Sequence, residues 1–364
     1  MTNLFSPITM NGLTLPNRIV IPPMDQYSAE NGVATEWHSI HYGHLALSGA
    51  GLLIVEATAV EAIGRISPND LGIWNDEQEE GHRAMLRFIR KFSRIPMGIQ
   101  LGHAGRKASC ARPWDGKGAL SPAEGGWEVC APSAAKYDPS SPEPVALTAG
   151  DMPRLVKAFV DVASRADRAG YDVIELHAAH GYLLHQFLSP LANFRTDEYG
   201  GTLEGRMRFP LEVFKAVRAV VPLSMPVGVR VSGSDFTEGG WNVEECAVFA
   251  KELEKLGCSF IHVSGGGLSP NQKITLGPGY QVSMAARVKA ATAMPTIAVG
   301  LITEPELASG IIISGQADMV AIGRGMLYDP RWPWHAAAKL GVSITDAPRQ
   351  YLRSEPRTAK GLFI

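Results

Sequence analysis

The chain has 364 residues, of which 45% are hydrophobic, and its formal net charge is −2. This length suffices for one large core, and barrel enzymes reach it as a single domain. The charge balance provides no basic field for nucleic acid or anionic lipid. The longest apolar runs, at residues 51–55 and 310–313, are too short to cross a bilayer.

Two further features bear on location. Residues 1–15 lack the basic and apolar segments of a signal peptide. The four cysteines are widely spaced and form no CxxC pair, which is typical of reduced thiols in a chain of this length. We therefore expect a cytoplasmic protein.

Short β-branched runs alternate with amphipathic stretches, an arrangement typical of βα units around a parallel sheet. Eight such runs occur, at residues 18–21, 52–56, 97–100, 173–177, 227–231, 260–263, 296–299 and 319–322. They are almost continuously hydrophobic, as strands buried on both faces are. Eight alternations favour an α/β fold of the (β/α)8 TIM-barrel type over a doubly wound sheet. No GxGxxG motif follows the first strand to support the doubly wound sheet.

Helix boundaries are indicated between the strands. Asp151 is expected to cap a helix that continues to residue 169. Asn242 with Glu245, and Thr303 with Glu306, have the spacing of capping boxes before two later helices.

Residues 107–144 interrupt the alternation, because they are rich in Pro, Gly and Ser and show no periodicity. We expect this long insertion after the third strand to be a lid or binding loop. A tolerated surface insertion is the alternative. The tail at residues 343–364 is also irregular and is too short for a domain. We therefore predict a single domain over residues 1–364.

Polar residues and glycines gather at the carboxyl ends of the predicted strands, where barrel enzymes carry their chemistry. These ends read Pro22-Pro23-Met24-Asp25-Gln26-Tyr27, Glu56-Ala57-Thr58, Gln100-Leu101-Gly102-His103 and His177-Ala178-Ala179-His180-Gly181-Tyr182, then Arg230, Ser264-Gly265, Gly300-Leu301 and Gly323-Arg324. Glycines after the last two strands, before short helices, let backbone N–H groups approach a phosphate, and Arg324 adds a cation. Simple tight turns are the alternative. The chain has no P-loop for a nucleoside triphosphate.

His177 and His180 stand three residues apart beside Tyr182. One interpretation is a pair of hydrogen-bond donors for a carbonyl oxygen, with Tyr182 as a proton donor. The other is a pair of metal ligands, completed by Glu56 or Asp235, in a metal-dependent barrel hydrolase.

Arg230 is expected to face the barrel interior, where a buried guanidinium needs an anion. A cofactor whose reduced form is anionic would satisfy this need. No lysine ends a strand as a Schiff-base enzyme requires, and Lys107 lies several residues beyond the third strand. Asp25 and Glu56 could be paired for glycoside hydrolysis, but that scheme gives the surrounding His and Arg residues no role.

Taken together, these residues resemble the Old Yellow Enzyme family of FMN-dependent ene-reductases, especially its bacterial thermophilic-like branch of NADPH dehydrogenases and xenobiotic reductases. The resemblance extends from Leu4 to Arg353, nearly the whole chain. It is carried by Asn17-Arg18 and by residues 22–24, 26–27, 56–60, 64–66, 100–107, 177–183, 187–190, 195–201, 206, 208 and 323–324. Each segment alone is weak evidence, but together they are highly specific.

The resemblance implies a role for each matching residue. The cofactor FMN would be bordered or bound by Pro22, Pro23, Met24, Asp25, Ala57, Gln100, His177, Arg230, Gly300, Gly323 and Arg324, the last three at its phosphate. Arg230 would stabilise the anionic reduced flavin. The substrate would be bound by Tyr27, Ile66, His177 and His180, with the histidines on its carbonyl oxygen.

The same resemblance implies the reaction. Hydride would pass from flavin N5 to the β-carbon of an enone, maleimide or nitroalkene, and Tyr182 would protonate the α-carbon. NADPH or NADH would then reduce the flavin again. A C-terminal arginine of this branch reaches into the partner subunit's site, and Gln350-Tyr351-Leu352-Arg353 fits that pattern. Arg353 is therefore the candidate, and a homodimer or dimer of dimers is implied.

Asp25 departs from the family pattern, because the branch usually has cysteine there. An ionised carboxylate about 4 Å from an anionic flavin would cost roughly 4 kcal/mol at an effective dielectric of 20. Burial could instead keep the carboxyl protonated. Asp25 therefore either slows flavin reduction, or adds a proton-transfer group that supports C=C isomerisation, or is a tolerated exchange.

Overall fold

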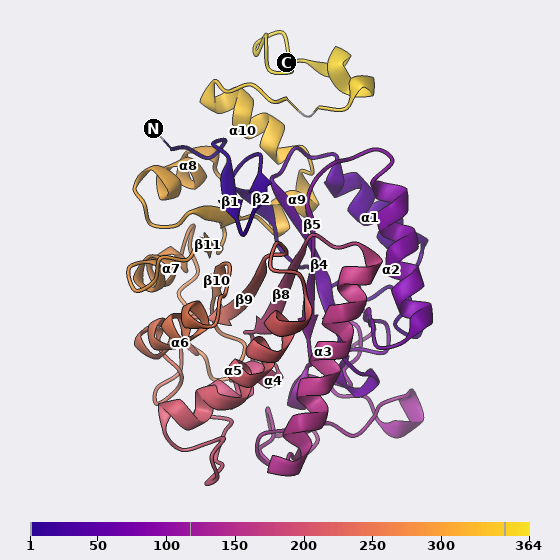
Figure 1. The fold of residues 1–364 in the computed structure, drawn as a ribbon, viewed down its shortest axis with the longest axis vertical. Helices are drawn as coiled ribbons and strands as arrows, with labels where there is room; N and C mark the ends of the chain where they lie inside the picture. Colours follow the sequence, from indigo (N-terminus) through magenta and orange to yellow (C-terminus); the bar gives the residue numbers. More distant parts are fainter. Residues whose placement is uncertain (1, 117, 346) are drawn as a thin grey trace.

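The computed structural model describes residues 2–116, 118–345 and 347–364. Eight parallel strands form a closed barrel in the order β10-β11-β12-β3-β4-β5-β8-β9, with helices around it (Figure 1). The strands are β3 (Ile19–Ile21), β4 (Leu52–Ala59), β5 (Met97–Gly102), β8 (Val173–Ala178), β9 (Val227–Ser232), β10 (Ile261–Ser264), β11 (Thr296–Ala298) and β12 (Met319–Ala321). Each of the eight predicted runs forms one of these strands, which confirms the predicted (β/α)8 barrel.

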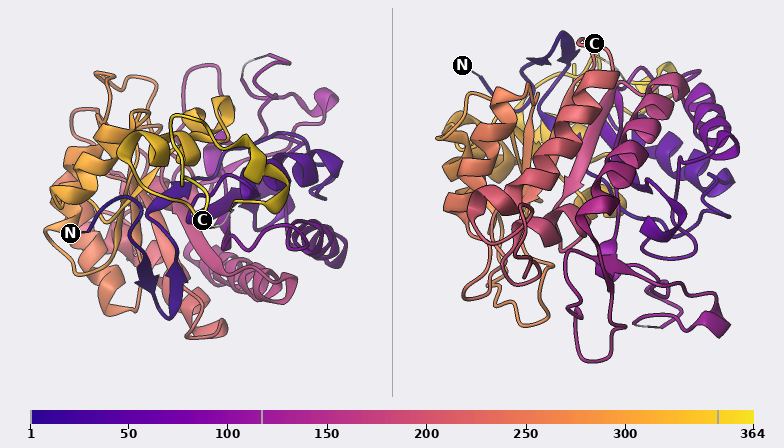
Figure 2. Two further views of the ribbon diagram at one scale, coloured as in Figure 1. Left: turned by 90° about the horizontal axis from the view of Figure 1, so that it is seen from above. Right: turned by 60° about the horizontal axis from the view of Figure 1, so that its bottom comes forward.

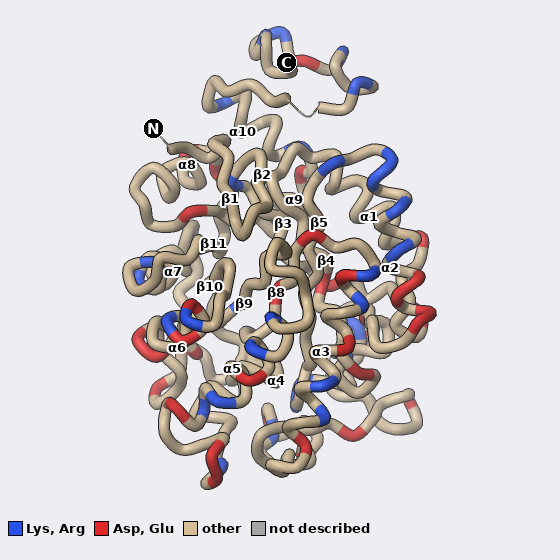
Figure 3. The backbone as a smooth tube through the Cα atoms, in the orientation of Figure 1, with Lys and Arg blue, Asp and Glu red and all other residues tan. Residues whose placement is uncertain are grey.

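The helices alternate with the strands along the chain. They are α1 (Glu36–Ala46), α2 (Asp76–Ile89), α3 (Met152–Ala169), α4 (Leu183–Leu188), α5 (Leu203–Val220), α6 (Val243–Lys255), α7 (Val282–Lys289), α8 (Pro305–Ile313), α9 (Arg324–Tyr328) and α10 (Trp332–Leu340). No helix in the described part of the chain is long and apolar enough to span a membrane. Positions of Lys and Arg are interspersed with those of Asp and Glu along the backbone (Figure 3).

Helix α3 shows how the sequence pattern forms these helices. Its apolar side chains, including Leu155 and Phe159, recur every three or four residues and are buried. The helix begins after Asp151, as predicted, and ends at Gly170, whose φ of +99° favours glycine. The Asp151 carboxylate does not cap α3, because it accepts hydrogen bonds from the backbone and hydroxyl of Thr148 instead.

The two later caps also differ from expectation in detail. Asn242 caps α6 through its side chain, but the Glu245 carboxylate pairs with Arg206 and closes no capping box. Helix α8 has Glu304 at its N-cap position, so the predicted box starting at Thr303 is wrong by one residue.

The amino end of the barrel is sealed by a hairpin that our sequence analysis did not predict. Strands β1 (Ile8–Met10) and β2 (Leu13–Leu15) are joined by Asn11 and Gly12, both at positive φ, as tight hairpin turns require. Hairpin and barrel side chains form one buried apolar cluster, which contains Met10, Leu15, Val20, Leu52, Ile54, Val173, Phe260, Ile297, Met319 and Ala321.

A bulge in β4 decides where its acidic residue points. The register with β5 shifts between Val55 and Ala57, and Ala57 then pairs with Gln100. The Glu56 carboxylate consequently contacts helix α1, where the Tyr42 hydroxyl donates to it at 2.5 Å.

The insertion and the C-terminal tail lie at opposite ends of the barrel (Figures 1 and 2). The insertion leaves the carboxyl end after β5, as predicted, and contains β6 (Cys130–Ala131), which pairs with β7 (Val145–Ala146). The tail follows α10 at the amino end, where Phe363 packs edge-on against Trp334.

Candidate active site

Polar side chains replace apolar ones inside the carboxyl half of the barrel. Gln100 of β5 donates from Nε2 to Glu175 of β8 at 2.8 Å, and the other carboxylate oxygen of Glu175 lies 2.8 Å from Nδ1 of His262 on β10. All three side chains are buried. Glu175 therefore links Gln100 to His262, whereas Nε2 of His262 is buried without a hydrogen-bond partner.

Arg230 lies on β9, where it pairs in register with His177 of β8 and His262 of β10. Its side chain is buried at 8% exposure, and its Nε has no hydrogen-bond partner. Within the described residues, no carboxylate or carbonyl bonds to this guanidinium. Burial lowers the pKa of Arg230, although the charge of Glu175 opposes this. An unpaired buried guanidinium is costly, so the position is suited to an anion.

His177, His180 and Tyr182 lie together, as the sequence predicts. The ring centroids of His177 and His180 are 5.1 Å apart, and those of His177 and Tyr182 are 4.9 Å apart. His177 Nε2 lies 3.4 Å from His180 Nδ1. The strand end of β8 and the turn before α4 therefore present three polar rings to one space.

Both histidines are neutral. Burial, and next the charge of Arg230, lowers the pKa of His177 and of His180 well below the usual value. The Ala179 N–H donates to His177 Nδ1 at 3.3 Å, so the ring proton of His177 is on Nε2. His180 Nε2 lies 2.7 Å from the Ser264 hydroxyl. When that hydroxyl donates, the His180 proton is on Nδ1, and each histidine offers one N–H donor.

Two tyrosines and a carboxyl complete the polar surface. Burial, and then the charge of Asp25, raises the pKa of Tyr182 well above the usual value, and Tyr27 is affected in the same way. One Asp25 oxygen accepts from the Tyr27 N–H at 3.1 Å, and the other is buried without a partner. Burial, with the charges of Asp70 and Glu56, raises the pKa of Asp25 well above the usual value. These shifts favour the protonated form of all three groups.

Asp70 was missed in the sequence. Its carboxylate accepts from the backbone N–H groups of Ile66 and Ser67 at 2.6 and 3.0 Å, and from the Ser67 hydroxyl at 2.6 Å. Burial raises the pKa of Asp70 to about 7. The Ser-Pro-Asn-Asp spacing, which is typical of a polar turn, was the available signal. One pocket is lined by Ala57, Ile66, Asp70, His103, His177 and Tyr182, among others.

The glycines near the last two strands lie close to other parts of the site. Gly300 has φ of +122°, which favours glycine. A Cβ added to Gly323 would lie 3.4 Å from Met24 Sδ and 3.6 Å from Pro22 Cγ, so the first and last strands meet here. Helix α9 begins directly after Gly323, whereas α8 begins only at residue 305, contrary to the expected short helix after Gly300.

The insertion reaches the site through aromatic and cationic side chains. Trp114, which is 61% exposed, packs edge-on against Tyr27 with 5.7 Å between ring centroids. Lys107 Nζ lies 5.0 Å from the ring centroid of Tyr182 and also 5.0 Å from that of Tyr137. Burial lowers the pKa of Lys107 to about 8.

The two acidic residues suggested as a third metal ligand contact other groups. Glu56 bonds to Tyr42 on α1, and the Asp235 carboxylate lies 2.9 Å from Nε2 of His185. In the described ranges, no group of three His, Cys, Asp or Glu residues has a metal-binding arrangement. The ligand set of the hydrolase interpretation is therefore not assembled.

Arg353 is not part of this site within its own chain. It is exposed and belongs to the tail after α10. This tail lies at the end of the barrel opposite the insertion (Figure 1).

Comparisons with known proteins agree with this geometry. Residues 3–342 match the model of the NADH:flavin oxidoreductase / NADH oxidase family. The chain is 44% identical to an NADPH dehydrogenase of Geobacillus thermodenitrificans, over 97% of this chain and 98% of that one. Morphinone reductase has a similar structure, with a TM-score of 0.78, 28% identity, and coverage of 100% and 96% of the two chains. An Old Yellow Enzyme homologue from Zymomonas mobilis has a TM-score of 0.77, 26% identity and 94% coverage of both chains.

Proposed function

Because the chain belongs to the NADH:flavin oxidoreductase / NADH oxidase family, we propose that it is an FMN-dependent ene-reductase that takes electrons from NADPH or NADH. Its substrates are small alkenes activated by a carbonyl or nitro group. The observation that carries this proposal is Arg230, a buried guanidinium without a protein partner beside two neutral histidines.

The residues present fit an FMN cofactor. The orphaned Arg230 suits the negative charge of a reduced flavin. Gly323 precedes helix α9 and has no Cβ, so the backbone N–H groups here are suited to a phosphate. We assign the cofactor to Pro22, Pro23, Met24, Asp25, Ala57, Gln100, His177, Arg230, Gly300, Gly323 and Arg324. When bound, FMN supplies hydride transfer from NAD(P)H to the alkene.

The two histidines bind the substrate oxygen. Neutral His177 and His180 each offer one N–H, and two such donors polarise a conjugated C=C bond without transferring a proton. Tyr27 assists the same oxygen, and Ile66 lines the substrate space with Tyr182. The β-carbon of the alkene thereby becomes more electrophilic.

Tyr182 is the proton donor. Its raised pKa keeps the hydroxyl protonated at neutral pH, so a proton is available for the α-carbon. The Lys107 ammonium beside its ring stabilises the phenolate that forms. A proton from solvent then restores Tyr182.

Asp25 is proposed to act as a neutral acid. Its raised pKa removes the repulsion that an ionised carboxylate would exert on a reduced flavin. Flavin midpoint potentials of the natural protein and of Asp25→Cys test this role. We expect similar potentials, and a much lower potential with Asp25 would show that the carboxyl is ionised.

A second activity is favoured by the buried Asp25 oxygen that lacks a partner. A protonated carboxyl in the substrate space can donate a proton at one carbon of an alkene and accept one at another. Redox-neutral C=C isomerisation is therefore the alternative function. Isomerisation of a β,γ-unsaturated ketone without NADPH, lost in Asp25→Asn, would support it.

The main proposal is tested by anaerobic titration of the purified protein. We expect a yellow protein that NADPH bleaches and cyclohexenone then reoxidises with one equivalent each. A colourless protein that binds stoichiometric zinc, or bleached flavin that cyclohexenone does not reoxidise, would contradict it.

We also propose a homodimer, or a dimer of dimers, in which Arg353 enters the partner's substrate site. The position of the tail supports this, because the segment that carries Arg353 lies at the amino end of the barrel, opposite the insertion (Figures 1 and 2). Sedimentation gives the oligomeric state, and Arg353→Ala should raise KM in the assembled protein. The four free cysteines support a cytoplasmic location.

A further inference from the structure

The segment from His180 to Tyr182 is held by side chains that bond to its main chain. The His180 N–H donates to Ser232 Oγ at 3.0 Å, and the His180 carbonyl accepts from Lys107 Nζ at 2.8 Å. The Gly181 N–H donates to His185 Nδ1 at 2.9 Å, and the Gly181 carbonyl accepts from Gln186 Nε2 at 2.8 Å. Each main-chain polar group of these two residues therefore has a side-chain partner.

The segment is strained, which explains why it needs these contacts. His180 has φ of +57°, a left-handed conformation that costs a non-glycine residue on the order of 1–3 kcal/mol. Gly181 is also left-handed, and a Cβ there would lie 2.2 Å from the Gly267 carbonyl. The main chain between His180 and Tyr182 is thus packed directly against the loop after β10.

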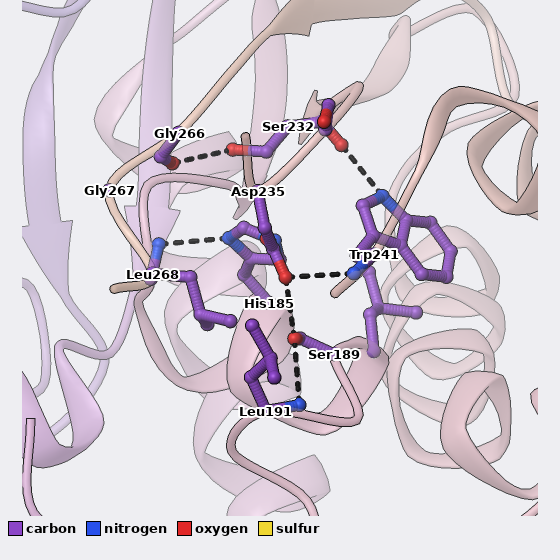
Figure 4. Close-up of polar contacts among 12 residues, drawn as sticks. His185, Ser189, Leu191, Ser232, Asp235, Trp241, Gly266, Gly267 and Leu268 are labelled. Carbon is purple, nitrogen blue, oxygen red and sulfur yellow. Dashed lines mark hydrogen bonds and ion pairs between the residues drawn. The ribbon is translucent and has the colours of Figure 1, made fainter. Parts of the chain in front are cut away.

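His185 bonds to this peptide in only one tautomer. Its Nδ1 accepts from Gly181, so its single ring proton must be on Nε2, which lies 2.9 Å from Asp235. Asp235 also accepts from the Ser189 hydroxyl at 2.6 Å and the Trp241 N–H at 2.8 Å (Figure 4). Burial raises the pKa of Asp235, but His185 and these donors lower it by more than burial raises it. The pKa is therefore below its usual value, and the carboxylate stays ionised. An ionised Asp235 selects the His185 tautomer with its proton on Nε2.

We propose that His185, oriented by Asp235, is a positioning residue that sets the geometry of Tyr182 relative to His180. The inference rests on the proposed roles of those two residues in binding and protonating the substrate. His185 touches no reacting atom; it acts through the Gly181 peptide between them. A misplacement of about 1 Å in such a group costs on the order of 100-fold in rate.

The reaction has two half-reactions, reduction of the flavin by NADPH and reduction of the alkene. Comparing their rates distinguishes a positioning role of His185 from a general contribution to folding. Flavin reduction by NADPH requires no proton from Tyr182. Reduction of the alkene requires hydride at the β-carbon and the Tyr182 proton at the α-carbon. Loss of the His185 contact is therefore expected to slow the second half-reaction and to spare the first.

Two substitutions at His185 remove one contact each. The Asn oxygen lies near the position of Nδ1, so His185→Asn keeps an acceptor for Gly181 and loses the polar contact with Asp235. The Gln amide nitrogen lies near the position of Nε2, so His185→Gln keeps the contact with Asp235 and loses the acceptor. Both leave one buried polar group unpaired, so similar losses of stability are expected.

Stopped-flow absorbance of the holoenzyme measures each half-reaction. We expect His185→Gln to slow cyclohexenone-dependent reoxidation by about tenfold or more, with flavin reduction within threefold of wild type. His185→Asn should restore the rate to within about threefold. Equal rates in the two variants, or equal slowing of both half-reactions, would overturn the proposal.

Asp235→Asn gives a second test, should His185→Gln fail to bind FMN. The Asn amide can donate to Nε2 and shift the His185 proton to Nδ1, which breaks the bond to Gly181. Long-range ¹H–¹⁵N spectra of the cofactor-free protein should show this change of tautomer, and the reoxidation rate should fall as in His185→Gln. A proton that remains on Nε2 together with a slowed rate would contradict the mechanism.

Two controls complete the experiment. His82 is also fully buried and bonds to Tyr171 at 2.7 Å, so His82→Gln reports the effect of losing a buried histidine elsewhere. Tyr182→Phe tests the underlying role. If Tyr182→Phe reoxidises at the full rate, the assignment of the proton donor fails; if only the His185 variants do so, the positioning role alone fails.

Discussion

The two ends of the barrel differ in the side chains that fill their interiors. At the amino end the hairpin side chains Met10 and Leu15 pack against Phe260 in an apolar cluster. At the carboxyl end Arg230 and Asp25 each have a buried polar atom without a partner. Apolar packing stabilises the fold without any ligand, whereas unpaired polar groups reduce stability until a ligand satisfies them. The comparison therefore separates residues that maintain the barrel from residues that serve its chemistry.

The largest effect is expected at the amino end. Phe260 is fully buried, and a Cβ on Gly228 would lie 2.4 Å from its ring. Phe260→Ala should lower the free energy of unfolding by about 3–5 kcal/mol, measured by urea denaturation, while FMN binding by the folded protein changes little. Leu223→Ala, at a position 84% exposed, is the control. A loss below about 1 kcal/mol would show that this end is not the stabilising one.

Arg230→Met should show the opposite behaviour. We expect a loss of about 10²–10³-fold in flavin reduction by NADPH, with the stability of the cofactor-free protein unchanged or increased. Arg218 is equally buried but donates to the carbonyls of Val221 and Met225. Arg218→Met should therefore lose stability and keep activity. If Arg230→Met were the less stable of the two, the comparison would fail.

Asp25→Asn tests the carboxyl end through the pH dependence of stability. The pKa of Asp25 is raised in the folded protein, so folding favours its neutral form. Its contribution to stability is fully present below the unfolded pKa near 4 and is lost as pH rises toward the folded value. Between pH 5 and pH 8 the free energy of unfolding should fall in both proteins, and we expect the fall in the variant to be smaller by at least about 1.4 kcal/mol. Asp70, with a pKa of about 7, makes the free energy of unfolding depend on pH to a similar degree in both proteins. Parallel pH profiles would indicate an ionised Asp25.

The smallest effect is expected at the rim. An edge-on aromatic pair contributes about 0.5–1.5 kcal/mol, so Trp114→Ala should raise KM for cyclohexenone by roughly two- to tenfold with kcat unchanged. Phe92, equally exposed after α2, provides the matched control. An unchanged KM in Trp114→Ala would assign Trp114 to the outer surface and not to the substrate mouth.

The sequence predicted the barrel well because continuous β-branched runs identify buried parallel strands. It also placed His177, His180 and Tyr182 together, since strand ends of a closed barrel meet at one rim. The hairpin was missed although Asn11-Gly12 is a strong turn signal.

The contacts that could not be predicted from the sequence depend on main-chain segments far away in the chain. The β4 bulge turns Glu56 toward α1, which no local pattern indicated. Lys107 bonds to the Gly267 carbonyl, 160 residues away, and the Asp235 carboxylate lies 2.9 Å from Nε2 of His185 on another element. These contacts join side chains to main-chain atoms or loops whose paths follow from closure of the barrel, so residue types alone do not reveal them.

Closure itself has a consequence for how the protein is made. Strand β3 pairs with β12, and Arg18 donates to the Asp318 carbonyl 300 residues later. At a synthesis rate of about 5–20 residues per second, the first strand waits roughly 15–60 s for its second neighbour. Until then the growing sheet has unpaired edges that invite association with other chains. Any chain released before β12 emerges is therefore a substrate for chaperones or for aggregation, whatever the state of its active site.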